Sequence, residues 1–140
     1  MLTSRLIHPP LLAELAACGH GSRVLLADAN YAHATNVRPG APVIYLNLRR
    51  GLVQVDDVLE LIVEAAPLEE VHAMRPDDDH TPPAWSGYER ILGPDQPLRP
   101  VARLDFYAAA RRADVAFAVA TGDDRLYANL LLTIGYLPPA

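Results

Sequence analysis

The chain has 140 residues, 51% of them apolar, which predicts one compact domain with enough apolar surface for a core and a further subunit interface. Its formal net charge of −5 excludes a nucleic-acid-binding surface, which needs Lys and Arg gathered on one face. Cys18 is the only cysteine, and the sequence has neither the apolar core of a signal peptide nor an apolar run of about 18 residues, so we expect a cytoplasmic protein without a disulfide or a membrane span.

Helices and strands alternate in the first half of the chain. Pro9 and Pro10 precede an apolar segment and Gly19 follows it, which is typical of a helix. Asp56 and Asp57 lie in the first turn of a segment whose apolar residues recur at helical spacing. The predicted elements are a helix over 10–18, a strand over 23–29, a loop over 28–42, a strand over 43–48 and a helix over 55–66.

The second half continues this alternation. Asp105 is expected to cap a helix, and two strongly apolar segments near the end are expected to be buried strands. An α/β fold follows: one layered domain over 1–140, with a largely parallel central sheet flanked by helices. The predicted elements are a strand over 69–74, a polar loop over 75–83, a helix over 84–92, a short strand over 101–104, a helix over 105–113, and strands over 114–121 and 129–134.

His20 stands between Gly19 and Gly21, where its side chain has little steric cover. Histidine titrates near neutral pH, so this position suits general acid–base chemistry. The alternative is a polar residue in a turn.

Asp28 follows an apolar strand, and Asn30 comes two residues later. Ligands of α/β sheets bind outside the carboxyl ends of the strands, so this carboxylate and amide are candidates for holding sugar hydroxyls. The alternative is an Asx turn that only caps the loop.

Three further polar residues lie in the last third of the chain. Arg103, at the edge of a strand, is a candidate for binding an oxygen-rich ligand, or else forms a surface ion pair with Asp105 or Glu14. Tyr127 and Asn129 are uncharged hydrogen-bonding groups of the kind that carbohydrate sites use. The alternative is a tyrosine packed on the sheet with its hydroxyl in water.

Other chemical signatures are weak or missing. The run Asp77–Asp78–Asp79–His80 resembles a metal cluster, but consecutive residues of a loop cannot all face one ion, so we expect a solvated loop. His33 and His72 have no partner at metal-ligand spacing, and Cys18 is expected to be a buried, inert thiol. Without nucleotide-binding glycines or a nucleophile elbow, we expect a reaction that needs no metal, cofactor or covalent nucleophile.

Four blocks in their order and spacing resemble the D-ribose pyranase / L-fucose mutarotase family over nearly the whole chain. They are LLAELAACGHGSRVLLADANY, TPPAWSGYERIL, RLDFY and AFAVATGDDRLYANLLLTIG. The resemblance is closest to the L-fucose mutarotase branch.

The resemblance implies roles for single residues. His20 falls on the family's catalytic histidine, Asp28 on its sugar-binding aspartate, and Arg103 on the arginine typical of the fucose branch. Tyr127 and Asn129 fall on its Tyr-x-Asn sugar-binding pair, with Asp28 and Tyr127 as further proton-transfer candidates. The resemblance also implies a homo-oligomer, often a decamer, with sites between neighbouring subunits.

The chain departs from the family pattern at three places, of which the second and third concern the choice of sugar. Ala32 and then His33 follow Tyr31, where the fucose branch usually has proline. The chain is about two residues longer near Arg112, and Ala128 replaces the glycine of the fucose branch, as in the ribose branch.

The function expected from this resemblance is an isomerase. It would interconvert the α and β anomers of a free monosaccharide, L-fucose in particular, by acid–base ring opening and closing. A ribose-type pyranase, a non-catalytic sugar-binding accessory protein of a transport system and a structural oligomer with a decayed site remain as alternatives.

Overall fold

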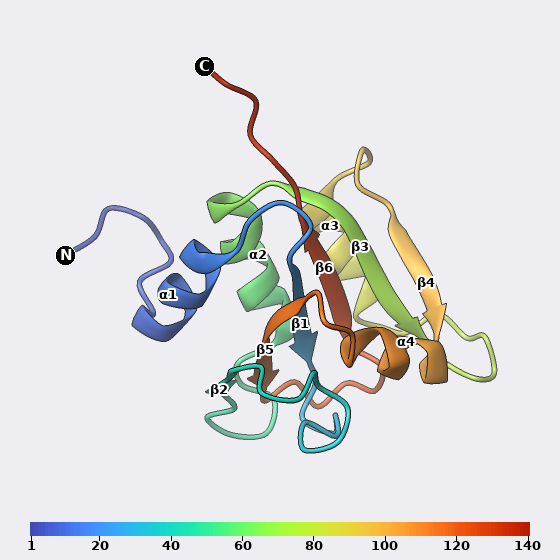
Figure 1. Ribbon diagram of the computed structural model, residues 1–140. Coiled ribbons are helices and arrows are strands. Elements are labelled where there is room, and N and C mark those ends of the chain that lie inside the picture. Colours follow the sequence, from blue (N-terminus) through green and yellow to red (C-terminus); the bar gives the residue numbers. More distant parts are fainter.

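The structure is a computed structural model that describes residues 1–140 as six strands and four helices (Figure 1). The helices are α1 (Pro9–Ala17), α2 (Val55–Ala65), α3 (Trp85–Leu92) and α4 (Arg103–Ala110). The strands are β1 (Arg23–Ala27), β2 (Val43–Leu46), β3 (Leu68–Arg75), β4 (Leu98–Ala102), β5 (Val115–Thr121) and β6 (Leu130–Ile134).

All six strands form one sheet in the order β2-β5-β1-β6-β3-β4, with β2 and β4 at its two edges (Figure 1). β1 runs parallel to β5, β5 to β2, and β3 to β4, while β6 is antiparallel to both of its neighbours, β1 and β3. Five strands therefore share one direction, which confirms the largely parallel α/β sheet predicted from the sequence. Their carboxyl ends therefore lie at the same end of the sheet, which is the end where β6 begins.

Both faces of the sheet are covered. In β1, Val24 and Leu26 belong to a core cluster with side chains of α1, α2 and α3, whereas Leu25 and Ala27 belong to a second cluster with Phe106 of α4. This alternation is the two-residue period of a strand. Because β1 is buried on both faces, it reads as a continuous apolar run rather than an alternating one.

The connection between β4 and α4 differs from the sequence prediction. We expected a strand over 101–104 and a helix capped by Asp105, but β4 begins at Leu98 and α4 begins at Arg103. β4 includes Pro100, which is tolerated because β4 is an edge strand paired only with β3. Asp105 lies inside the first turn of α4, where its charge suits the helix dipole without capping it.

The longest helix, α2, has 11 residues, and none of the four is long and apolar enough to cross a membrane.

Candidate functional site

The topology brings together four of the five predicted site residues. Asp28 directly follows β1, and Arg103 directly follows β4. Tyr127 and Asn129 lie in the segment just before β6, so all four residues are at the end of the sheet where the parallel strands end. They line one small cleft of about 180 Å³. Typical ligand pockets measure about 300–1,000 Å³, so this cleft suits only a small ligand or part of a larger site.

 Five further side chains complete the lining of the cleft: Asn30, Tyr31, Met74, Tyr107 and Leu126. Ala128 is buried and does not line it.

Asp28 is the buried carboxylate of this cleft. Only 2% of the residue is exposed, and its Oδ1 accepts a hydrogen bond from the Asn30 backbone N–H at 2.9 Å. Burial disfavours the charged form and raises the pKa of Asp28 to about 6, although hydrogen bonds to the carboxylate act in the opposite direction. The Asx turn weighed from the sequence is therefore present, and the same side chain is also poised to exchange a proton near neutral pH.

Asn129 holds Asp28 from the neighbouring strand. Its Oδ1 accepts a hydrogen bond from the Asp28 backbone N–H at 2.7 Å, which leaves its Nδ2 with only the Met74 sulfur, at 3.6 Å. A thioether sulfur is a weak acceptor, so the amide N–H groups of Asn129 are available to a ligand with hydroxyl oxygens.

Tyr127 has a strained backbone. Its φ is +61°, in the left-handed region that bulky residues rarely adopt and that costs of order 1–3 kcal/mol. The segment is held by the next residue, because the Ala128 carbonyl accepts a hydrogen bond from the buried Tyr88 hydroxyl at 2.9 Å. Strain that the surrounding structure maintains in this way is typical of functional sites.

Arg103 is the first residue of α4 and lines the cleft. Its Nε and Nη2 donate to Asp77 Oδ2 at 3.1 and 3.0 Å, and its guanidinium carbon lies 5.9 Å from the centre of the Tyr107 ring. The carboxylate of Asp77 raises the pKa of Arg103, which stays charged. The partner is thus Asp77, and not the Asp105 or Glu14 considered from the sequence.

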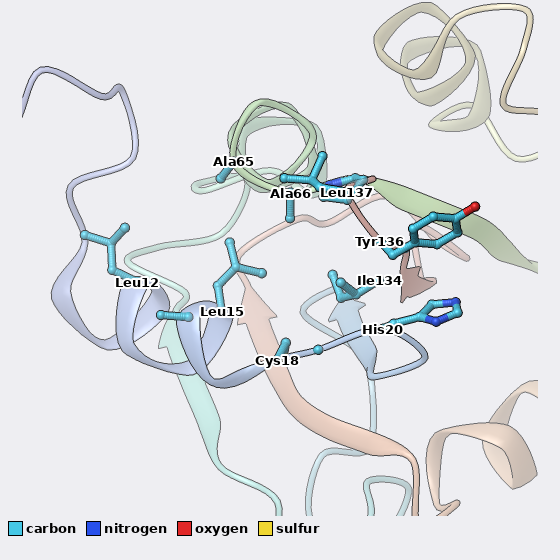
Figure 2. Close-up of a pocket in the computed structure, with 13 residues that line it drawn as sticks. Leu12, Leu15, Cys18, His20, Ala65, Ala66, Ile134, Tyr136 and Leu137 are labelled. Carbon is cyan, nitrogen blue, oxygen red and sulfur yellow. The ribbon is translucent and has the colours of Figure 1, made fainter. Parts of the chain in front are cut away.

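His20 lies at the opposite end of the sheet, before β1 begins. Its Nε2 is 2.9 Å from Glu69 Oε2, and its ring lies 5.3 Å from that of Tyr136. Figure 2 shows His20 beside Tyr136 at the rim of an apolar hollow lined by residues of α1, the end of α2 and the segment after β6. A neutral histidine that donates from Nε2 to a carboxylate keeps Nδ1 free as a proton acceptor.

Within one chain, His20 does not reach the other four residues. The five residues of β1 separate it from Asp28, and at about 3.3 Å per residue this strand alone spans roughly 17 Å. The carboxylate that contacts His20 is that of Glu69, and not that of Asp28.

Several residues of the two regions were not predicted. Glu69 and Tyr136 contact His20, while Met74 and Tyr107 line the cleft around Asp28. Tyr107 lies in the RLDFY block, although no role was assigned to it, and the other three residues belong to no sequence motif. The sheet order alone places the end of β3 beside the start of β6, and the predicted parallel sheet did not specify that order.

Of the remaining candidates, His33 and His72 line neither region, whereas Cys18 lines the hollow beside His20. His33 packs its ring against Tyr31, and burial lowers its pKa. His72 Nδ1 is 3.2 Å from Arg23 Nη2, and its pKa is likewise lowered by burial. Cys18 is half-buried, and burial raises the pKa of its thiol, which favours the unreactive form.

The layered fold is that of a known protein class. A model of the RbsD / FucU transport protein family matches residues 1–137, and the chain belongs to this family. This confirms the family predicted from the sequence.

Curated relatives and solved structures agree with this assignment. The chain is 35% identical to the fucose mutarotase of Danio rerio over 94% of this chain and 90% of that protein, and 32% identical to the fucose mutarotase of Homo sapiens with the same coverage. It is similar to the fucose mutarotase of Streptococcus pneumoniae in complex with L-fucose, with a TM-score of 0.80, 29% identity and coverage of 94% and 95% of the two chains. Bacillus subtilis RbsD complexed with D-ribose shares the fold, with a TM-score of 0.83, 24% identity and coverage of 99% and 100%. Mutarotases are isomerases, which confirms the predicted enzyme class.

Proposed function

We propose that this chain is a mutarotase that interconverts the α and β anomers of free L-fucose, at sites built from two copies of the chain. One copy would contribute the cleft with Asp28, Arg103, Tyr127 and Asn129, and a neighbouring copy would contribute His20. The preference for L-fucose rests on the named relatives and on Arg103, the residue typical of the fucose branch.

The observation that carries the proposal is the separation of the polar groups. A buried carboxylate with a raised pKa, a free amide and a strained tyrosine share one edge of the sheet, while the histidine with its own carboxylate lies at the other edge. The cleft lacks a histidine, and the surface around His20 lacks the polar groups of the cleft. A second copy that brings its His20 to the cleft would place all these groups at one site, and the decamer implied by the family resemblance is one assembly that would do so.

The chemistry requires two proton transfers. Mutarotation opens the hemiacetal ring and closes it on the other face, so one group removes the proton of the anomeric hydroxyl and another protonates the ring oxygen. Asp28, with its pKa near 6, and the Nδ1 of His20 would be the two exchanging groups. Tyr127 would relay a proton, while Arg103 and Asn129 would hold hydroxyl oxygens.

Saturation-transfer NMR tests this function directly. We expect protein-dependent magnetisation transfer between α- and β-L-fucose, and we expect His20→Ala to fold normally but to lose most of it. Exchange between the ring sizes of D-ribose, without exchange of L-fucose, would instead establish the ribose-type pyranase. Line broadening of the sugar signals without any transfer would establish a sugar-binding accessory protein.

A further inference from the structure

The loop between β3 and α3 carries three consecutive aspartates that have three different partners. Asp77 pairs with Arg103, Asp78 with His80, and Asp79 with Arg75. The run therefore does not converge on one point. The loop is anchored at two prolines, Pro76 and Pro82, which are buried although the residues between them are exposed.

Two of these loop residues contact the candidate sugar cleft. Asp77 Oδ2 accepts from both Nε and Nη2 of Arg103, which fixes the guanidinium plane. Arg103 is about one-third exposed, at 34%, so without this double contact its long side chain would be free to adopt other rotamers.

The second contact is made by His80. Its Nδ1 is held by the Asp78 carboxylate, and its ring packs edge-on against the Tyr127 ring, with centroids 5.9 Å apart and an angle of 81°. Such an edge-to-face arrangement is a favoured aromatic geometry. Tyr127 is the residue with the strained backbone, so His80 contacts a side chain whose own backbone conformation is unfavourable.

We propose that the β3–α3 loop is the positioning element of the sugar cleft. In this loop Asp77 orients the Arg103 side chain, and His80 orients the Tyr127 side chain, toward the oxygens of the bound monosaccharide. Asp77 and His80 are positioning residues, because they act through Arg103 and Tyr127. This inference rests on the proposed function for its catalytic readout, but the two contacts themselves are testable without it.

The chain offers a matched control for Asp77. Asp77→Asn and Asp79→Asn remove the same charge from the same loop, but only the first loosens Arg103. We expect Asp77→Asn to raise KM for L-fucose about three- to fivefold with kcat changed less than about twofold, the size expected for an exposed ion pair. Asp79→Asn is expected to leave both constants unchanged. Equal effects of the two substitutions would overturn the role of Asp77.

A double substitution separates positioning from a general effect on the fold. In an Arg103→Gln background, Asp77→Asn is expected to add no further change in KM, because its partner is already gone. In a Tyr127→Phe background, His80→Ala is likewise expected to add nothing, whereas in the wild-type background it lowers exchange and the neighbouring Thr81→Ala does not. Additive effects in either pair would contradict the proposal.

A spectroscopic readout keeps this test independent of the enzyme activity. The Nε–H proton of Arg103 is expected to exchange slowly with water in the wild type and in Asp79→Asn, and fast in Asp77→Asn. If the wild type shows this protection but no exchange of any sugar, the proposed function fails while the contact stands. If the Nε–H proton is unprotected in the wild type, the positioning role of Asp77 fails whatever the activity.

Discussion

Asp28 is a carboxylate in a place where charge is unfavourable. It is buried, yet its backbone N–H and its Oδ1 are both held by hydrogen bonds, so the side chain cannot turn to solvent. Holding an ionisable group in this state costs stability, and such a cost is commonly found where a proton has to be exchanged.

The cost predicts a pH-dependent difference between the wild type and Asp28→Asn. The folded pKa, about 6, lies above the ordinary value of about 4, so the folded protein binds this proton more tightly than the unfolded chain. The Asp28 contribution to stability therefore falls as pH rises from about 4 to about 6 and stays low above that. Asparagine removes the titration, so we expect the variant to gain about 1–3 kcal/mol relative to the wild type between pH 4.5 and 7.5, while it loses exchange activity.

Urea denaturation at the two pH values measures this difference. The same stability difference between wild type and variant at both pH values would show that the Asp28 carboxyl is not perturbed.

Gly122 marks a close approach between two loops. A Cβ at this position would lie 2.1 Å from the Leu52 carbonyl oxygen and 2.3 Å from that of Arg49, and backbone atoms cannot yield as a flexible side chain can. We expect Gly122→Ala to destabilise the fold by about 1–3 kcal/mol, as overpacking does. Gly19→Ala is the control, because a Cβ there meets nothing within 4 Å, and a thermal unfolding shift of equal size in both variants would contradict the packing argument.

The sequence was sufficient to predict which single residues gather at the cleft, but not what holds them. Asp28, Arg103 and Asn129 lie at the ends of predicted strands, and Tyr127 just precedes one. The rule that ligands bind outside the carboxyl ends of strands indicated Asp28, and the family resemblance implied the roles of the other three. The contact between Asp77 and Arg103 joins the β3–α3 loop to the start of α4, 26 residues further along the chain, and no local pattern encodes it. We expected the loop around Asp77 to be solvated, and its residues are indeed exposed. The loop also contacts Arg103 and Tyr127, and this was not predicted.

At the scale of elements, the loop before β6 is tied to the start of α2. Arg125 donates from Nε to Asp123 Oδ1 at 2.9 Å and also pairs with Asp56 of α2. Asp123 is fully buried, and its Oδ2 accepts from the Val55 backbone N–H at 3.0 Å, which satisfies one of the free donors at the helix start. The contacts with Arg125 and Val55 outweigh burial and lower the pKa of Asp123.

Removing Arg125 leaves a buried carboxylate without its cation. We expect Arg125→Leu to cost about 3–5 kcal/mol of stability, as is found when one partner of a buried pair is lost. Arg5→Leu is the control, since Arg5 forms exposed ion pairs with Glu60 and Glu64, further along the same helix α2. Chemical denaturation compares the two, and an effect of Arg125→Leu no larger than that of the control would refute the role of this link.

Element boundaries were predicted best where an apolar period or a helix-ending residue marks them. α2 is an example, with apolar residues at helical spacing and Pro67 after its end. The start of α4 was missed because its first residue, Arg103, follows a strand without a turn, and a proline inside β4 argued against a strand there. Pairing with β3 decides that boundary, and pairing is a tertiary property.

At the scale of the whole molecule, large apolar side chains are exposed beside both halves of the proposed site. Leu137 is 78% exposed and Tyr136 is 67% exposed next to His20, and Leu126 is 62% exposed next to Tyr127. An oligomer that joins the two halves would cover these side chains, as expected for apolar surface that gathers around a polar site.

This arrangement predicts the effect of a charge at the His20 side. We expect the wild type to be larger than a dimer by light scattering, and Leu137→Asp to dissociate into folded monomers of about 15 kDa with little exchange activity. Leu2→Asp is the control, because Leu2 is also exposed, at 56%, but lies near the N-terminus and does not line the hollow beside His20. A wild type that is a monomer and fully active would contradict both the assembly and the shared site.

The shared site is tested most directly by mixing two inactive variants. His20→Ala lacks the histidine half and Asp28→Asn lacks the carboxylate half, but a mixed oligomer contains contacts in which an intact His20 of one chain meets an intact Asp28 of another. After the two variants are unfolded together in equal amounts and refolded, we expect saturation transfer between the anomers of L-fucose to return to about one-quarter of the wild-type rate, the fraction of such contacts under random assembly. No recovery in mixed oligomers, while each variant refolded alone stays inactive and assembled, would contradict a site built from two chains.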